Sequence, residues 1–398
     1  MPRIVVIGAG LLGGSLLAAL QAQRLAAERR YHLGAVSSAA TLEGLRARGW
    51  CDALHEYDDL AAACAEADLV LLCTPLSAIE AQIDAIAALR AHLAANAIVM
   101  DVGSTKAAIC KHGFAAFPDT GPGAARFVGG HPMAGSERSG LAASDPLLYQ
   151  SALWVLCPPD DLPAARLTPI IELVKAIGAR VAILDPQLHD AAVARISHVP
   201  QVLASVLAGW AGAEDALADA SLALAAGGFR DMTRLALSSW DVWRDIVATN
   251  PQPIADGLRE LAQRLALLAD AAHDWSTDAS DRTAPDHANA GTAAATRSAE
   301  LFGAAFAAGK AFRDRFRMPR KGIVHDLSEL VVRLDDRPGQ LLALLTPLAA
   351  AGINVQDLEI LKVREGESGT VLLGFSAAAE AEQACAVLEA QRFTVTYR

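Results

Sequence analysis

The chain has 398 residues, of which 53% are hydrophobic and 20% are charged, and its formal net charge is −11. This composition excludes a disordered chain and allows about two to three domains with cores of their own. The acidic balance disfavours nucleic acid or an anionic membrane as a partner, so an anionic ligand would need a local cluster of Arg or Lys. The six cysteines are scattered, with no CxxC pair and no zinc spacing, which predicts a cytoplasmic protein without a metal site.

Short apolar runs alternate with helical segments through the first part of the chain. Runs such as "RIVVI" and "LVLLC" have the length and the Val, Ile and Leu content of buried parallel strands. We expect strands at residues 3–7, 31–36, 69–73, 97–102, 126–128, 153–156 and 180–184. Their alternation with helices predicts a doubly wound parallel sheet, the Rossmann layout of a dinucleotide-binding domain, over residues 1–185.

Two further domains are expected after this sheet. Ala- and Leu-rich helical periods fill residues 186–317 and predict an all-α domain, in which the polar stretch 276–293 reads as a loop. We expect this domain to serve substrate binding and dimerisation, which the family resemblance given below implies. "RMPRKG" resembles a linker. Residues 323–398 then show strand, helix, two strands, helix and strand, which is the ferredoxin-like βαββαβ layout.

A glycine-rich loop follows the first expected strand. Gly8, Gly10 and Gly13 have GxGxxG spacing between that strand and a helix, where glycines permit a tight turn and a close approach of pyrophosphate. The helix start offers free N–H groups to the phosphates. The cofactor-binding residues expected here are Gly8, Gly10, Leu11, Leu12 and Gly13, joined by Thr74 and Pro75 at the end of the "LVLLC" strand.

The second expected strand ends in "GAVSS", with Ser37 and Ser38 where an acidic residue would bind the ribose 2′-hydroxyl. Without that carboxylate a 2′-phosphate is not repelled, serine hydroxyls can donate to it, and Arg46 or Arg48 is near enough in sequence to reach it. We therefore expect NADP to be accepted and slightly favoured over NAD. The alternative is that NAD binds well enough without the acid.

Four later segments concentrate polar groups in apolar surroundings. They are "DVGSTK" (101–106), "GGHPMAGSERSG" (129–140), "LHDAAVARISHVPQ" (188–201) and "GGFRDMTRLALSSWDVWRDI" (227–246). In this order they resemble the prephenate dehydrogenase family, over residues 1 to about 315. The resemblance implies oxidative decarboxylation of prephenate to 4-hydroxyphenylpyruvate in tyrosine biosynthesis. Arogenate dehydrogenase and a dual-substrate cyclohexadienyl dehydrogenase are the alternatives.

The resemblance also implies catalytic residues. Hydride loss from a carbinol needs a base for the hydroxyl proton, and histidine titrates in the right range. His131, in "GGHPMAG", matches the base of the family. Ser104 matches a serine that hydrogen-bonds the substrate hydroxyl and His131, although a serine after a glycine is also common as a helix cap.

Prephenate carries two carboxylates, which arginine binds well. Arg234 and Arg244 lie in matching segments, and one of them should bind the ring carboxylate, with Arg230 as a third candidate and simple salt bridges as the alternative. The remaining family positions expected at the substrate are Glu137, His198 and Gln201, with a satisfied core histidine as the equal alternative for His198. The family often has histidine where Gln201 stands, so the preference between keto acid and amino acid stays open.

The last segment separately resembles an ACT domain, a small amino-acid-binding regulatory module. "DRPGQL" and "AGINVQDLEI" carry this likeness. It implies inhibition by an aromatic amino acid, most plausibly tyrosine, bound between paired modules near Asp336, Gly339 and Asn354 in a homodimer. The alternative is a module that only dimerises.

Two other functions compete with this hypothesis. A β-hydroxyacid or imine reductase would place a catalytic lysine in the helical domain, but lysine is absent between Lys175 and Lys310. A non-catalytic sensor of nucleotide and amino acid would need no base, which argues against it because of His131 and Ser104.

Overall fold

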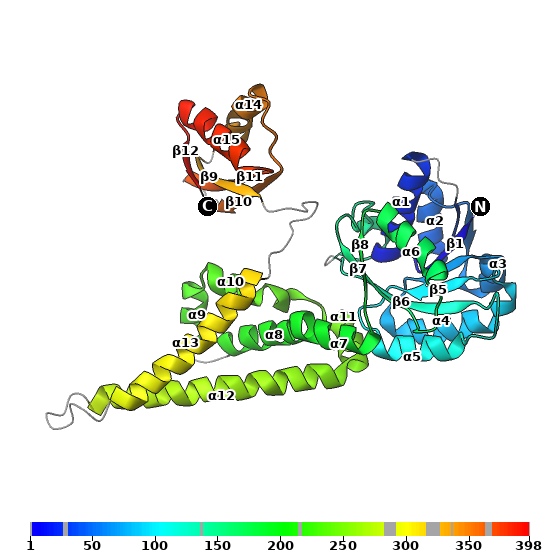
Figure 1. Cartoon of the computed structure of the whole chain (residues 1–398), viewed down its shortest axis with the longest axis horizontal. Helices are drawn as coiled ribbons and strands as arrows, with labels where there is room; N and C mark the ends of the chain where they lie inside the picture. Colours follow the sequence, from blue (N-terminus) through cyan, green and yellow to red (C-terminus); the bar gives the residue numbers. More distant parts are fainter. Residues whose placement is uncertain are drawn as a thin grey trace. The chain divides into compact units, whose positions relative to one another are not determined.

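The computed structural model describes residues 2–26, 31–135, 138–213, 217–281, 292–315, 327–335, 337–362 and 368–397. The chain divides into two compact units, Met1–Ala311 and Phe312–Arg398. Figure 1 shows the helices and strands of both units.

An eight-stranded sheet forms the first half of the first unit, in the order β3-β2-β1-β4-β5-β6-β7-β8. Its strands are β1 (Arg3–Ile7), β2 (His32–Val36), β3 (Ala53–His55), β4 (Leu69–Leu72), β5 (Ile98–Asp101), β6 (Arg126–Pro132), β7 (Leu153–Cys157) and β8 (Arg180–Ile183). The central strands are buried on both faces, which is why they read as continuous apolar runs. The Rossmann-like fold class is confirmed.

The sheet differs from the expected one at its far edge. β7 pairs with β6 antiparallel, and β8 follows β7 in parallel, so the sheet is mixed. The reason is the connection: only the short 3₁₀ turn η3 (Leu141–Ala143) lies between β6 and β7 in the described residues. A parallel pair would need a longer crossover, usually a helix. β3, only three residues long, was not predicted.

Helices cover both faces of this sheet (Figure 1). They are α1 (Leu11–Ala26), α2 (Ala39–Arg48), α3 (Leu60–Cys64), α4 (Leu76–Ala88), α5 (Ala107–Ala116) and α6 (Ala164–Ala176), with 3₁₀ turns η1 (Tyr57–Asp59) and η2 (Arg90–His92). α1, α2 and α6 contribute to one buried cluster, and α3, α4 and α5 contribute to the other. This is the doubly wound arrangement that places the carboxyl ends of the parallel strands at one edge.

The second half of the first unit is helical. Its elements are α7 (Pro186–Val193), the π-helical turn η4 (Ala194–His198), α8 (Val199–Ala211), α9 (Ala218–Leu224), α10 (Gly227–Thr233), the 3₁₀ turn η5 (Arg234–Leu237), α11 (Trp240–Thr249), α12 (Pro251–Asp281) and α13 (Thr292–Arg315). α12 continues into the stretch expected to be a loop, because extending a formed helix costs little per residue. The remainder of that loop, residues 282–291, lies outside the described residues.

Residues Pro186–Ala211 form the one helix in the described part of the chain that is long and apolar enough to cross a membrane, by length and composition alone. A single such helix is weak support for a membrane span. This helix carries the buried polar residues His189, Asp190, His198 and Gln201. Their hydrogen bonds, described below, account for the buried side of this helix.

The second unit is a four-stranded antiparallel sheet, in the order β10-β11-β9-β12, covered by two helices. Its elements are β9 (Ser328–Asp335), α14 (Gln340–Ala350), β10 (Asp357–Lys362), β11 (Ser368–Phe375), α15 (Ala378–Ala390) and β12 (Thr394–Tyr397). The predicted βαββαβ layout is confirmed, although β10 starts four residues later than expected. The expected linker, residues 317–322, lies outside the described residues.

Candidate active site

The glycine loop joins β1 to α1 and has the geometry that a dinucleotide requires. Gly8 has φ +91°, and a Cβ there would lie 2.7 Å from Thr74 Cγ2. A Cβ on Gly13 would lie 2.0 Å from the Gly8 oxygen, whereas a Cβ on Gly10 would meet nothing within 4 Å. Gly8 and Gly13 therefore hold the turn against its neighbours, and Gly10 leaves open space beside the free N–H groups of the α1 start. These residues fit a nicotinamide dinucleotide.

The end of β2 shows no carboxylate among the residues that follow it directly. Ser37 is buried and its N–H donates to the His55 oxygen at 3.1 Å, whereas Ser38 is exposed, with its Oγ 3.1 Å from Thr41 Oγ1. The guanidinium of Arg48 donates to the Gly44 oxygen at 2.9 Å and lies over the Trp50 ring. Only the Ser38 hydroxyl is thus exposed at the strand end itself.

His131 lies near the end of β6 and is bonded to a second histidine that the sequence analysis had not singled out. The His131 Nδ1 atom is 2.8 Å from His189 Nε2, and His189 Nδ1 is 2.8 Å from Asp190 Oδ1. The two rings meet edge to face with centroids 5.0 Å apart. Burial, followed by the positive charge of Lys106, lowers the pKa of His131 well below its ordinary value. His131 is therefore neutral near pH 7, as a base must be.

Asp190 ties this histidine pair to the sheet. Its Oδ1 and Oδ2 accept hydrogen bonds from the N–H groups of Lys106 and Ala107, at 2.7 and 2.8 Å, where α5 begins. Asn250 Nδ2 donates to the Asp190 carbonyl at 2.9 Å and lies 3.2 Å from His198 Nδ1. The continuous helix Pro186–Ala211, the end of α11 and the start of α5 are thus joined at one buried polar cluster.

His198 itself is buried beside Trp243, with ring centroids 5.9 Å apart. Burial lowers its pKa to about 4. Together with the Asn250 contact, this makes His198 a neutral member of the cluster. The sequence left open whether His198 contacts substrate or is a core histidine with its hydrogen bonds satisfied. The contact with Asn250 shows that its Nδ1 atom already has a hydrogen-bond partner within the protein.

A buried ion pair lies beneath His131. Lys106 Nζ contacts Asp101 Oδ2, and neither side chain is exposed to solvent. Asp101 also accepts hydrogen bonds from the N–H groups of Gly103, at 2.8 Å, and Gly130, at 3.1 Å. The carboxylate therefore holds the backbone at two places, two residues after the end of β5 and one residue before His131.

Ser104 lies half-buried in the loop between β5 and α5. No hydrogen bond joins it to His131 within the described residues, and the His131 Nδ1 atom contacts His189. Glu137, expected near the substrate side chain, lies outside the described residues.

The arginines expected to bind substrate are exposed on the helical part. Arg244, on α11, has its side chain 60% exposed and lies 3.6 Å from Asp245, whose Oδ2 accepts from the Ser77 N–H at the start of α4. Arg234 begins the η5 turn and makes no ion pair with any described residue. The Arg244 contact matches the salt bridge that we considered as its alternative role, although at this exposure it stabilises little.

Gln201 is buried and directed to the turn that carries Arg234. Its Nε2 donates to the Leu235 oxygen at 2.7 Å, and its Oε1 accepts from Ser238 Oγ at 3.4 Å. The side chain that was expected to contact substrate is therefore used to hold η5 on α8.

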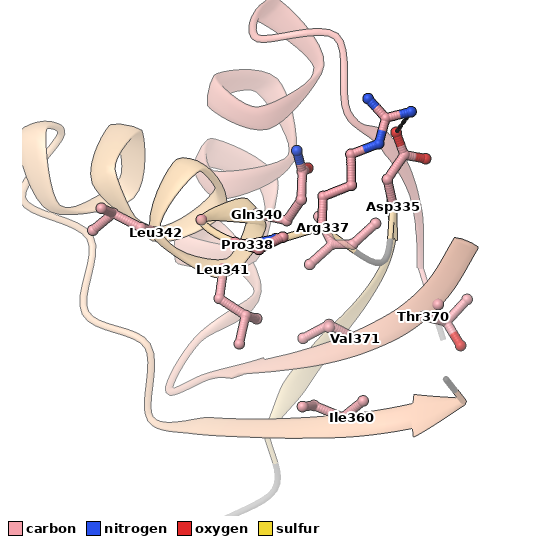
Figure 2. A pocket seen from close by; sticks show the side chains of 12 residues that line it. Asp335, Arg337, Pro338, Gln340, Leu341, Leu342, Ile360, Thr370 and Val371 are labelled. Atoms are coloured by element: carbon pink, nitrogen blue, oxygen red, sulfur yellow. Dashed lines mark ion pairs between the residues drawn. The ribbon is translucent and has the colours of Figure 1, made fainter. Parts of the chain in front are cut away.

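The second unit contains a separate cavity of about 570 Å³. Figure 2 shows that it lies between the start of α14 and strands β10 and β11, with the Asp335–Arg337 ion pair at its rim. Gly339, with φ +88°, is one of its lining residues. Asn354 is exposed and is not among them, and Asp336 lies outside the described residues.

Sequence reasoning missed His189, Asn250 and the Asp101–Lys106 pair. The His-Asp dipeptide in "LHDAAV" was visible, but one polar pair in a helix has many structural explanations. Asn250 ends α11, where it reads as an ordinary helix terminus. The buried charges lie at the end of β5 and at the N-cap of α5, and the sequence pattern does not show that these two end positions are buried together.

The glycine loop and the half-buried His131 fit an oxidoreductase that uses a nicotinamide cofactor. Two family models match the chain: the nucleotide-binding domain of prephenate dehydrogenase over residues 36–183, and its dimerization domain over residues 185–280. The chain belongs to the prephenate dehydrogenase family.

Individual relatives agree with this family. The chain is 27% identical over 394 residues to the prephenate dehydrogenase of Bacillus subtilis, covering 98% of this chain and 96% of the relative. It is 29% identical over 402 residues to that of Lactococcus lactis, covering 99% and 100%. The crystal structure of Synechocystis arogenate dehydrogenase is similar with a TM-score of 0.62 and 26% identity, over 79% of this chain and 100% of that one.

Proposed function

We propose that this protein oxidatively decarboxylates prephenate to 4-hydroxyphenylpyruvate, with His131 as the base. The observation that carries the proposal is the half-buried His131, whose lowered pKa keeps it neutral, held near the end of β6 in a sheet whose glycine loop fits a dinucleotide. The carboxyl edge of such a sheet is where cofactor and substrate meet. A nicotinamide cofactor bound at that loop would accept the hydride from ring carbon C4.

The chain's own residues move the hydroxyl proton. The Nε2 atom of His131 takes the proton of the C4 hydroxyl while the O–H bonding pair forms the carbonyl. The ring carboxylate then leaves as CO2, and its bonding pair enters the ring, which becomes aromatic. The oxygen on C4 takes a proton back from His131, so the base is restored. Ser104 is proposed to orient the same hydroxyl, because it lies on the loop that follows β5, next to β6.

We assign to Arg234 the binding of the negatively charged ring carboxylate of the substrate. Arg234 makes no ion pair with a described residue, whereas Arg244 already has Asp245 at 3.6 Å. A free guanidinium can form a bidentate pair with the ring carboxylate. Gln201 supports this role by fixing the turn that Arg234 begins.

We further propose that NADP is accepted and slightly preferred. No carboxylate directly follows β2, and the exposed Ser38 hydroxyl can donate to a 2′-phosphate. Comparing kcat/KM for the two cofactors tests this, and a strong preference for NAD would contradict it.

Regulation by tyrosine is proposed for the second unit. The cavity there has the volume of a small-molecule site. Gly339, which lines the cavity at the start of α14, has no side chain to fill it. Ile360→Trp, on the cavity wall, should raise the tyrosine concentration for half-inhibition. Unchanged inhibition would place tyrosine in the active site instead.

The protein is proposed to act as a homodimer through its helical part, where large apolar side chains such as Trp210, Leu224 and Phe306 are exposed.

The experiment that tests the main proposal is a panel of prephenate and arogenate with NAD and NADP. Absorbance of the reduced cofactor should grow with prephenate, with one 4-hydroxyphenylpyruvate and one CO2 formed per reduced cofactor. Turnover of arogenate alone would change the substrate assignment. No turnover of either would refute the proposal.

A further inference from the structure

The ring of His131 is the outer member of a buried series of three groups. His189 and Asp190 are each 1% exposed, and neither is needed to contact the substrate or the cofactor. The distances along the series are 2.8 Å between the two rings and 2.8 Å between His189 and Asp190. Both are ordinary hydrogen-bond lengths, so each contact must contain one donor and one acceptor.

With an ionised Asp190 and a neutral His189, the hydrogen-bonding capacities of the three groups set one direction for the series. An ionised carboxylate only accepts, so the Nδ1 atom of His189 must carry a hydrogen. A neutral His189 then has a bare Nε2 atom, which accepts. His131 must therefore carry its hydrogen on Nδ1, and its Nε2 atom is left with a lone pair.

Two backbone donors contact the Asp190 carboxylate from the other side. Its carboxylate accepts the N–H groups of Lys106 and Ala107 at the start of α5, where the helix dipole favours negative charge. The Asn250 amide fixes the backbone of the same residue. The orientation of the series thus originates in a capped helix end of the sheet part.

We propose that His189 and Asp190 are positioning residues that set the tautomer of His131, leaving Nε2 as the proton acceptor. This inference rests on the proposed function of His131. The second ring has a further consequence: it keeps the Asp190 carboxylate one imidazole away from the cleft. A carboxylate in direct contact with His131 would lie closer to a substrate that itself carries two carboxylates, and like charges repel. When His131 is protonated, the series still supplies an acceptor for its Nδ1 hydrogen.

The direct test is imidazole ¹⁵N NMR of the histidine-labelled full-length protein, with the His131 signals identified through His131→Asn. The wild-type protein should show His131 with hydrogen on Nδ1 and a bare Nε2. In His189→Leu the Nε2–H tautomer should appear, and kcat should fall roughly 10²-fold, the contribution of a positioned base, with the KM for prephenate little changed. His189→Gln, which keeps an acceptor facing His131, should restore the tautomer and part of kcat.

His112→Gln is the matched control, because His112 forms a similar 2.7 Å contact with Asp84 on the surface of α4 and α5. It should change neither the His131 signals nor kcat. A wild-type His131 with hydrogen on Nε2 would overturn the inference, with no variant needed. So would His189→Leu with an unchanged tautomer and kcat. With active wild-type enzyme, either result leaves the proposed oxidative decarboxylation intact, and hydrogen on Nε2 would remove only the role of that atom as the acceptor. A wild-type enzyme inactive on both substrates refutes the proposed function and not the tautomer assignment.

Discussion

Asp101 and Lys106 form an ion pair that is completely buried beneath the loop between β5 and α5. The pair is part of the active-site frame, because Asp101 accepts from the N–H of Gly130, one residue before His131, and Lys106 lowers the pKa of His131 through its charge. One buried contact thus influences both the position and the protonation of the proposed base.

Removing one partner of this pair should be costly. Lys106→Met leaves the Asp101 carboxylate buried without its counter-charge, and we expect the free energy of unfolding to fall by about 3–5 kcal/mol. The double variant with Asp101→Asn should lose less, because no lone charge remains. Urea unfolding of the three proteins measures both quantities. An exposed ion pair typically contributes no more than about 1 kcal/mol. If the free energy of unfolding of Lys106→Met lies within that range of the wild-type value, the pair is not buried as described.

Stability should fall in mild acid because of His198. Its pKa is about 4 in the folded protein, whereas an unfolded histidine has its ordinary value near 6.5. Between these values the unfolded chain takes up a proton that the folded chain does not, so the free energy of unfolding decreases as the pH falls. The loss approaches about 1.4 kcal/mol per pH unit.

The comparison that isolates this effect is His198→Gln. Urea unfolding from pH 7 to pH 4.5 should show a shallower decline for the variant, while His131, whose pKa is also lowered, keeps its own contribution in both proteins. Identical slopes would show that His198 titrates normally in the folded state.

Arg234→Ala should raise the KM for prephenate. A lost charge-assisted hydrogen-bond pair costs about 1.5–3 kcal/mol, which is roughly 10–100-fold. Arg244→Ala should have a smaller effect, because Arg244 already contacts Asp245. Arg264→Ala is the control, since that arginine pairs only with Glu260 on the α12 surface among the described residues. A larger rise for Arg244→Ala would reverse the assignment.

Ser38→Asp should reverse the cofactor preference. The new carboxylate would repel a 2′-phosphate but could accept a hydrogen bond from a 2′-hydroxyl. We expect kcat/KM with NADP to fall at least about tenfold, because the carboxylate and the 2′-phosphate carry like charges, and kcat/KM with NAD to stay the same or rise. Ser38→Asn, of the same shape and neutral, should discriminate less. Equal loss with both cofactors would indicate a damaged loop.

The apolar runs predicted most of the strands, because a strand that is buried on both faces is apolar at successive positions and forms a continuous apolar run. They did not predict strand direction: β7 runs antiparallel because its connection to β6 lacks a helix, and a run such as "LWVLC" contains no information on direction. For the site, the difference between what was predicted and what was missed depends on distance along the sequence. GxGxxG is a contiguous pattern and was predicted, whereas the bond between His131 and His189 joins residues 58 positions apart and exists only in the folded chain.

The central claim is that His131 accepts the hydroxyl proton of the substrate, and single-turnover kinetics of His131→Asn test it most directly. With saturating prephenate and oxidised cofactor, the rate of cofactor reduction should fall by about 10²–10⁴-fold, while a folded protein still binds both ligands. A variant that reduces the cofactor at nearly the wild-type rate would show that another group removes the proton.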